Sequence, residues 1–397
     1  MLEKFHMTPG PTEVPLSVLQ AMIRGAISPG DPEFIKVMDE TEHLLEQLFY
    51  TKNWVIFFPG SGRVTIESAF LSVLEEGDKV LIPVNGVFSK WLGIIVERLG
   101  NKPILIDLDW RKAVDPLKVK KALEKDPEIK IVAMVHNETS TGIVNPIKEI
   151  GEIVNNSDAL YFVDSVSSLG GDKVDTDTWG IDLNCTGSYK CINCVPGLSI
   201  LSVSNRAWDT MSRRKKPARS YGFDLYRWIE MWIPPDRGGK LIWGYRRHPI
   251  EPAPHLTYAL HESVRLLLEE GLEKRFLKNK IGGEAVRAGV KAIGLELYPL
   301  DDSFASNTVT GILPPEKIES EKIINTLKEN YGVIIGGGLE ETHNKVLRIA
   351  HMGITSDEMY IIKTLSAIEQ TLRKLGYDLK RGKAISTAEK IFEQYKT

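Results

Sequence analysis

Lys190 lies between two cysteines in the stretch DLNCTGSYKCINCVPG, just after a run that is typical of a β-strand. Three interpretations of this lysine compete: a neighbour of a zinc or redox cysteine site, a surface lysine on a loop, and a buried amine nucleophile. The cysteines are Cys185, Cys191 and Cys194, and the last two form a C-x-x-C pair. A zinc site would need a further cysteine or histidine pair, and a redox pair would open a helix without Pro and Gly close behind. The pattern favours structural thiols and predicts no metal site.

Asp164 stands at the end of another apolar run, ALYFVDSV, and precedes Lys190 by roughly 25 residues, which is typical of one βα repeat. Ligands of open α/β sheets bind at the carboxyl ends of the strands. A carboxylate there needs a partner, because burying an unpaired charge is costly. The alternative is an aspartate that caps the next turn. If both residues follow strands of one sheet, an acid and a lysine share the same rim.

A Pro-Gly-Ser-Gly turn separates a strand from a helix in FFPGSGRVTIESAF. The backbone N–H groups and the helix dipole at such a turn make an anion site suited to phosphate, and Ser61 can add a hydroxyl. The stretch is not a Walker A motif, since no Lys-Ser/Thr follows the second glycine. Taken alone, a plain tight turn explains it equally well.

A phosphate site, an acid and a buried lysine together match the needs of pyridoxal phosphate (PLP). Lys190 would form a Schiff base with the aldehyde, and Asp164 would keep the pyridine nitrogen protonated so that the ring accepts electrons. An aromatic face would help to hold the ring, and Phe88 in VNGVFSKW follows a strand. The residues therefore predict a PLP enzyme.

The elements that would position these residues alternate along the first 205 residues. Buried strands are predicted for WVIFF, KVLIPV, PILIDLD, KIVAMVH, ALYFVDSV and LSILSVS. Helices are predicted for RVTIESAFLSVLEEG, DPLKVKKALEKD and NPIKEIGEIVNN, with Gly77 as the C-cap of the first. Several strands lack polar alternation, which fits a parallel sheet covered on both faces. The fold class is therefore α/β, with a doubly wound sheet.

The pattern changes after about residue 205. HLTYALHESVRLLLEEGLEKRF predicts one long amphipathic helix, and ASNTVTGIL, YGVIIGGGLE and KVLRIAHMG predict strands of a smaller sheet. A further helix would run from Ser356 as its N-cap to Gly376 at its end. We expect a large domain over residues 1–270, which includes an N-terminal segment 1–15, and a small α+β domain over residues 271–397.

Composition excludes several classes of protein. The 397 residues are 42% hydrophobic and 26% charged, which is typical of a globular protein. The formal net charge of −3 does not favour general binding to nucleic acid or anionic membranes. No apolar run approaches the roughly 20 residues that span a bilayer, and the N-terminus lacks the apolar core of a signal peptide. The basic run at residues 213–216 is best explained as a solvated loop. We expect a cytoplasmic protein without nucleic-acid or membrane partners.

Seven ordered motifs resemble class V (fold type I) PLP-dependent aminotransferases, above all the alanine–glyoxylate and serine–pyruvate group with its archaeal members. The motifs are TPGPTEVP, GSGR…ESAF, VNGVF, VHNETSTG, VDSVSSLGG, TGSYKC…PGL and KVLRIAHMG. The resemblance covers nearly the whole chain. It implies a mostly parallel seven-stranded sheet flanked by helices, a smaller C-terminal domain, and a homodimer with active sites at the subunit interface.

The resemblance also implies roles for individual residues. Lys190 would carry the Schiff base and move the proton, and Asp164 would pair with the pyridine nitrogen. Arg348 would bind the substrate α-carboxylate in a bidentate contact, with Gly10 bordering the substrate. The remaining cofactor contacts would come from Ser61, Gly62 and Arg63 at the phosphate, Phe88 on the ring, Thr139 near the phenolic oxygen, and Val166 and Tyr189.

Three positions depart from the family's pattern. The family usually has Thr or His in place of Arg63, and Gln in place of Tyr189. A threonine that reaches the phosphate from the partner subunit is replaced here by Glu251. A carboxylate near a phosphate is repulsive, so Arg63 would pair with Glu251 or meet the phosphate itself.

The expected activity is transfer of an amino group from a small L-amino acid, alanine or serine, to glyoxylate or pyruvate by a ping-pong mechanism. A pyridoxamine–pyruvate aminotransferase is the alternative. A cysteine desulfurase would need a catalytic cysteine in the C-terminal half, and none follows Cys194. A PLP-binding transcription regulator would need a DNA-binding domain, for which the N-terminus is too short.

Overall fold

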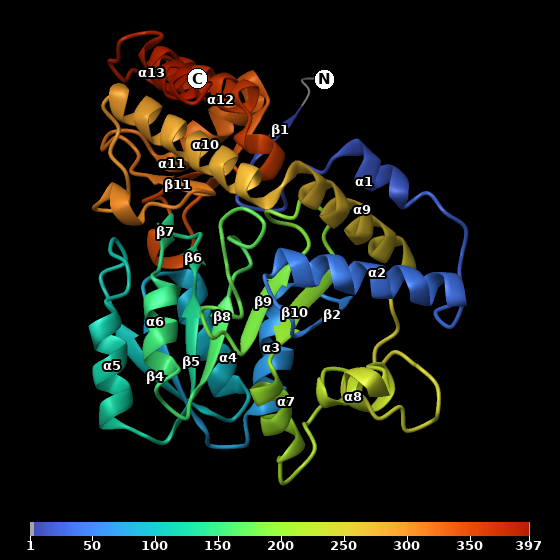
Figure 1. Cartoon of the computed structure of the whole chain (residues 1–397). Helices are drawn as coiled ribbons and strands as arrows, with labels where there is room; N and C mark the ends of the chain where they lie inside the picture. Colours follow the sequence, from blue (N-terminus) through green and yellow to red (C-terminus); the bar gives the residue numbers. More distant parts are fainter. Residues whose placement is uncertain (1–3, 397) are drawn as a thin grey trace.

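The apolar runs of the first 205 residues form a seven-stranded sheet in the computed structural model, which describes residues 4–396 (Figure 1). In spatial order its strands are β2 (Trp54–Pro59), β10 (Leu198–Val203), β9 (Leu183–Gly187), β8 (Leu160–Asp164), β5 (Ile129–Val135), β3 (Lys79–Val84) and β4 (Lys102–Asp107). Strand β10 is antiparallel to β2 and β9, and the remaining pairs are parallel. The predicted α/β class with a mostly parallel seven-stranded sheet is confirmed.

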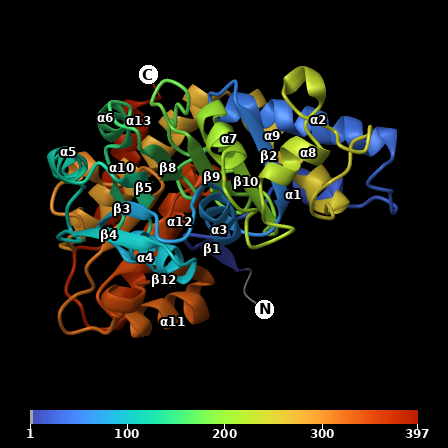
Figure 2. The same ribbon diagram turned by 90° about the horizontal axis from the view of Figure 1, so that it is seen from below.

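Helices cover both faces of this sheet. Helices α3 (Gly62–Val73) and α4 (Val87–Arg98) connect β2 to β3 and β3 to β4, which takes the chain across the sheet to its β4 edge. Helices α5 (Pro116–Lys125) and α6 (Ile147–Val154) connect β4 to β5 and β5 to β8, in the opposite direction across the sheet. Because βαβ crossovers are right-handed, the two pairs of helices lie on opposite faces (Figure 2). Strands β2, β8, β9 and β10 are accordingly almost wholly buried, whereas the edge strand β4 is half exposed.

A second sheet of four strands belongs to the C-terminal part of the chain. Its order is β1 (Phe5–Met7), β12 (Val333–Gly337), β13 (Leu347–Ala350) and β11 (Val309–Ile312). Figure 1 shows this sheet and helices α10 to α13 stacked above the large sheet. The other elements are α1 (Leu16–Ala21), α2 (Pro32–Leu48), the hairpin β6 (Asn137–Glu138) and β7 (Ile143–Val144), α7 (Asn205–Ser212), α8 (Tyr226–Met231), α9 (Pro254–Glu270), α10 (Leu272–Ala292), α11 (Ser320–Tyr331), α12 (Glu358–Lys374) and α13 (Lys383–Gln394).

Two large hydrophobic cores indicate where the chain divides. The larger core contains buried side chains between Val18 and Leu267, and the smaller one contains Met7 and buried side chains between Ala285 and Phe392. A third cluster of four residues joins Cys191 to Val309, Ala350 and Met352. We therefore propose that the domains meet at Gly271. Within the N-terminal segment 1–15, which was predicted to belong to the large domain, β1 instead pairs in parallel with β12 and Met7 is buried in the smaller core, whereas Thr12 bonds to the backbone of Lys190. Residues 1–3 of that segment lie outside the described residues.

Three predicted helix features differ in the structure. The single helix expected over residues 255–276 is two helices, since Gly271 adopts a φ of 89° between α9 and α10. Helix α3 ends at Val73, so Gly77 lies in the following turn rather than at the cap. The N-cap of α12 is Asp357, because the hydroxyl of Ser356 instead donates to the carbonyl of Gly353. Gly376 follows the end of α12 with a φ of 86°, as expected.

Candidate active site

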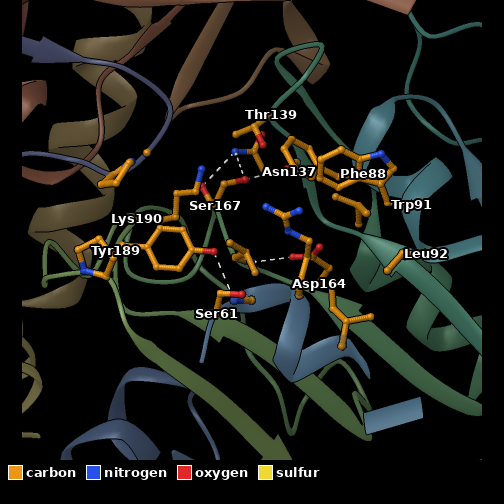
Figure 3. Close-up of a pocket in the computed structure, with 18 of the residues that line it drawn as sticks. Ser61, Phe88, Trp91, Leu92, Asn137, Thr139, Asp164, Ser167, Tyr189 and Lys190 are labelled. Carbon is orange, nitrogen blue, oxygen red and sulfur yellow. Dashed lines mark hydrogen bonds between the residues drawn. The ribbon is translucent and has the colours of Figure 1, made fainter. Parts of the chain in front are cut away.

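The carboxyl ends of the parallel strands open into a cavity of about 500 Å³. Every predicted site residue except Arg348 lines it: Gly10, Ser61, Gly62, Arg63, Phe88, Thr139, Asp164, Val166, Tyr189 and Lys190. Figure 3 shows Lys190 and Tyr189 on one side, Phe88 and Trp91 on the other, and Ser61 and Asp164 toward the floor. The strand-to-loop junctions of β2, β3, β5, β8 and β9 thus bring residues from distant parts of the sequence to one place.

Lys190 lies three residues beyond the end of β9, and its amine points into this cavity. The amine donates to the carbonyl of Pro9, and a Cβ built on Gly10 would lie 2.5 Å from Nζ. Thr12 holds the lysine backbone by a 2.9 Å bond from its hydroxyl to the Lys190 carbonyl. Burial, helped by the positive charge of Arg348, lowers the pKa of Lys190 from 10.5 to about 8. A useful fraction of the amine is therefore neutral near neutral pH.

Asp164 ends β8, and its carboxylate is only half satisfied. One oxygen accepts from the N–H of Val166 at 2.9 Å, and the other has no hydrogen-bond donor among residues 4–396. Burial, together with the negative charge of Glu138, raises the pKa of Asp164 from 3.8 to about 7, although Lys190 opposes the shift. Such a carboxylate is stabilised as an anion when a cationic N–H is placed against its free oxygen.

The N-terminus of α3 supplies backbone donors to the cavity. The N–H of Gly62 donates to the Tyr189 hydroxyl at 3.3 Å, whereas the N–H groups of Arg63 and Val64 have no acceptor within the described chain. A Cβ on Gly62 would lie 2.6 Å from a methyl of Val166, so glycine is needed for this packing. Free N–H groups at the positive end of a twelve-residue helix form an anion site.

Glu138, which the sequence reasoning did not single out, anchors the segment that carries Phe88. Its buried carboxylate accepts from the N–H groups of Phe88 and Ser89 at 3.3 and 2.9 Å and from the Ser140 hydroxyl at 2.6 Å. Gly86 precedes the helix, and a Cβ there would lie 2.3 Å from the Glu138 side chain. The acid within the motif VHNETSTG was the available signal, since a buried carboxylate needs donors.

Arg348 lies on β13 behind the wall of the cavity rather than in it. Its Nε donates to the carbonyl of Gly337 at 2.7 Å and its Nη1 to the carbonyl of Thr139 at 3.1 Å. Nη2 has no acceptor among residues 4–396. Burial lowers the pKa of Arg348 to about 10, and Glu138 opposes the shift. Two of the five guanidinium N–H donors are thus used within the protein, and the remaining ones, on Nη1 and Nη2, are the donors left for the predicted contact with a carboxylate.

The positions that depart from the family's pattern also have defined surroundings. The guanidinium of Arg63 lies over the face of Trp91, 5.0 Å from the ring centre. It makes no ion pair with any residue that the structure describes. The predicted pair with Glu251 would form across two subunits and stays a prediction. Tyr189 is partly buried, and its hydroxyl lies beside the helix N-terminus.

The three cysteines are buried, unpaired thiols. Burial raises the pKa of Cys191 and of Cys194 from 9.0 to about 12, which keeps both protonated and unreactive. Cys191 packs against Gly171, where a Cβ would lie 2.6 Å from its sulfur. The thiols flanking Lys190 thus act as small packing residues.

Comparison with known proteins gives a consistent result. Residues 9–220 match the family model described as Aminotransferase class-V. The chain is 38% identical over 379 residues to an uncharacterized aminotransferase of Methanocaldococcus jannaschii, covering 96% of this chain and 95% of that protein. It is 36% identical over 397 residues to the (S)-ureidoglycine–glyoxylate transaminase of Bacillus subtilis, covering 98% and 95%. It is 32% identical over 398 residues to the serine–glyoxylate aminotransferase of Methylorubrum extorquens, covering 97% and 95%.

Solved structures agree with these relatives. The ureidoglycine–glyoxylate aminotransferase of Bacillus subtilis superposes with a TM-score of 0.92 at 35% identity, over 99% of both chains. The pyridoxamine–pyruvate aminotransferase of Mesorhizobium loti also gives 0.92, at 28% identity over 99% of this chain and 98% of that one. Among the described helices, none combines the length and apolarity needed to cross a membrane.

Proposed function

The chain belongs to the class V aminotransferase family, and from this premise we propose that it moves an amino group from a small L-amino acid, alanine or serine, to glyoxylate or pyruvate. That it is a PLP-dependent aminotransferase follows from the family and from its structural neighbours. The choice of substrates rests on relatives named for glyoxylate, pyruvate and serine. The observation that carries the proposal is that a lysine of lowered pKa and a half-satisfied carboxylate line the same cavity.

The residues present fit PLP. The free oxygen of Asp164 suits a pyridine N–H, and the unsatisfied N–H groups of Arg63 and Val64 suit a phosphate. Phe88 offers an aromatic face on the opposite wall from Lys190 (Figure 3). When bound, the cofactor accepts the electron pair released at the substrate Cα.

Lys190 would hold the cofactor through its amine and later move a proton to and from the substrate Cα. Its lowered pKa suits both tasks, since a base is most useful when its pKa lies near the working pH. The Pro9 carbonyl and the bare Gly10 backbone leave the lysine side chain just enough room beside the N-terminal segment. Arg348 would bind the substrate carboxylate and, by its charge, help to keep the amine neutral.

We propose further that the protein acts as a homodimer with shared active sites. Among the large apolar side chains that are exposed on the single chain, two groups lie close together in the sequence: Leu16 and Ile23 near α1, and Ile242, Trp243 and Tyr245 after α8. Contiguous exposed apolar patches mark sites of protein–protein interaction, and we propose that these two groups contribute to such a patch.

The test is the visible spectrum of the purified protein, followed by single additions of L-alanine, L-serine and pyridoxamine. A yellow band that L-alanine or L-serine bleaches supports the proposal and identifies the donor. Bleaching by pyridoxamine alone would replace it with the vitamin-consuming reaction of the pyridoxamine–pyruvate enzyme. A Lys190→Ala variant should lose turnover by about 10²–10⁴-fold or more, because it lacks the proton carrier. Retention of substantial turnover would disprove the assignment of Lys190.

A further inference from the structure

Trp91 is held at the mouth of the cavity by groups from three separate elements. Its indole Nε1 donates to Oε1 of Glu340 at 2.6 Å. Phe88 packs edge-on against the ring at 5.3 Å between centres, and the Arg63 guanidinium covers its face. Phe88 and Trp91 are on α4, Arg63 is on α3, and Glu340 belongs to the C-terminal part of the chain.

The acidic side of this contact is a short loop, residues 338–343, between β12 and β13. The adjacent Glu341 and Glu340 both bind Lys90 on α4, with Nζ–oxygen distances of 2.5 and 3.1 Å. These hydrogen bonds raise the pKa of Lys90 and lower that of Glu341. The loop is thus tied to the large sheet's helix by one hydrogen bond and two ion pairs.

The backbone of the loop is strained at the residue that makes this contact. Glu340 adopts a φ of 44°, a left-handed conformation that is unfavourable for a residue other than glycine. Thr342 supports the turn, since its hydroxyl accepts from the N–H of Leu339 at 2.9 Å and donates to the Leu339 carbonyl at 2.8 Å. A strained residue held in place by side-chain contacts indicates that the placement of its carboxylate matters.

The same loop connects two parts of the proposed substrate site. Leu339 lines the cavity beside Trp91. Gly337, directly before the loop, accepts from Nε of Arg348, which is the proposed carboxylate-binding group. A shift of the loop would therefore move the cavity wall and the support of Arg348 together.

We propose that Glu340 is a positioning residue for substrate binding. Glu340 binds Trp91 and Lys90, and these contacts fix the position of the loop. Leu339 and Trp91 are then held in place as the wall that meets the substrate side chain. The carbonyl of Gly337 is likewise held in place behind Arg348. This wall favours donors with small side chains. The proposal rests on the proposed aminotransferase function and identifies what limits its substrate size.

The experiment compares Glu340→Ala, Trp91→Phe and their double variant with the wild-type holoenzyme, using L-alanine, L-serine and the bulkier L-leucine as donors. Trp91→Phe keeps an aromatic ring at this position but removes the indole donor together with the pyrrole part of the ring. Loss of a partly exposed hydrogen bond to a carboxylate predicts KM for the small donor raised about three- to tenfold, with kcat within about twofold. The donor concentration that half-bleaches the visible band should rise in parallel, and discrimination against L-leucine should fall.

Three comparisons make the result specific to the Glu340–Trp91 contact. The double variant should be no worse than Glu340→Ala alone, because both single changes remove the same interaction. Glu341→Gln is the matched control: it weakens a contact of Lys90, leaves the Glu340–Trp91 bond intact, and should stay within about twofold of wild type. Glu340→Gln, which keeps an acceptor for the indole, should recover part of the KM loss.

Wild-type KM and wild-type donor preference in Glu340→Ala and Trp91→Phe would overturn the inference. So would fully additive effects in the double variant. A wild-type protein that shows a yellow band but reacts with none of the donors would instead reject the proposed substrates, which keeps the two failures distinct. Thermal unfolding of each variant identifies any that fails to fold, in which case Glu340→Gln carries the comparison.

Discussion

At the scale of single residues, Lys190 can attack an aldehyde only while its amine is neutral. With a pKa of about 8, the neutral fraction falls about tenfold for each pH unit below 7 and saturates above about pH 9. We therefore predict that the cofactor-free protein captures PLP at a rate that rises with pH and levels off with a midpoint near 8. Stopped-flow absorbance of the yellow band measures this rate.

Arg348 provides the control for that titration. Replacing Arg348 by Met removes a cation that disfavours the protonated amine, so the midpoint should move to higher pH. A wild-type midpoint near the ordinary lysine value of 10.5 would contradict the buried environment of Lys190. An unchanged midpoint in Arg348→Met would show that burial alone lowers its pKa.

Burial of Asp164 lowers the stability of the cofactor-free protein when the carboxyl group ionises. Because its folded pKa of about 7 lies above the ordinary 3.8, the folded state binds the extra proton, and this contribution to stability is lost as pH rises from 4 to 7. In the cofactor-free protein, Asp164→Asn should thus gain stability relative to wild type as pH rises through this window, by at most on the order of 4 kcal/mol. The measurement is thermal unfolding of both proteins at pH 5 and 7.5.

The same variant should lose turnover when loaded, because an amide cannot stabilise a protonated pyridine nitrogen as a carboxylate does. A difference in unfolding temperature that does not change with pH would mean that Asp164 is ionised and satisfied without the cofactor.

Residues that follow strands were predictable from the sequence, whereas residues that meet across the fold were not. Asp164 and Phe88 stand at the ends of apolar runs, so the sheet edge dictates where they lie. The contact of Glu340 with Trp91 joins residues 249 positions apart, and no local pattern encodes it. The position of Arg348 behind the wall depends on how β13 pairs with β12, which periodicity does not reveal.

At the scale of elements, the break between α9 and α10 escaped prediction because the amphipathic pattern continues across it. Only the φ of 89° at Gly271 separates the two helices. A Cβ there would meet no atom within 4 Å, so substitution adds strain without a clash. We predict that Gly271→Ala lowers the free energy of unfolding by about 1–2 kcal/mol, as measured by denaturant titration.

Gly25 is the matched control for this substitution. It also has open space around its Cβ position, but its φ lies outside the left-handed region. Gly25→Ala should therefore leave stability within about 0.5 kcal/mol of wild type. Equal losses of unfolding free energy in the two variants would show that backbone strain at Gly271 does not cause the destabilisation.

At the scale of the whole molecule, the N-terminal segment connects the two sheets. Strand β1 pairs with β12, and the chain then brings Pro9 and Gly10 against the side chain of Lys190. It continues into α1, which lies beside α9 (Figure 1). The motif TPGPTEVP predicted that this segment borders the site. Its membership of the smaller sheet could not be predicted, since a three-residue edge strand carries almost no pattern of its own.

The exposed apolar side chains after α8 support the proposal that a second copy of the chain covers this segment. Trp243 and Tyr245 lie in the segment after α8 with 44% and 58% of their surfaces exposed, and Glu251 follows a few residues later. If this segment packs on a partner, Trp243→Ser should shift the protein from twice the chain mass toward the single chain in analytical ultracentrifugation. It should also weaken PLP retention, because the proposed site is completed by the partner.

Ile94→Ser, at an exposed apolar position on α4, is the control and should leave both the sedimenting mass and PLP retention unchanged. A wild-type protein that sediments as a single chain with full PLP retention would show that each chain forms a complete site.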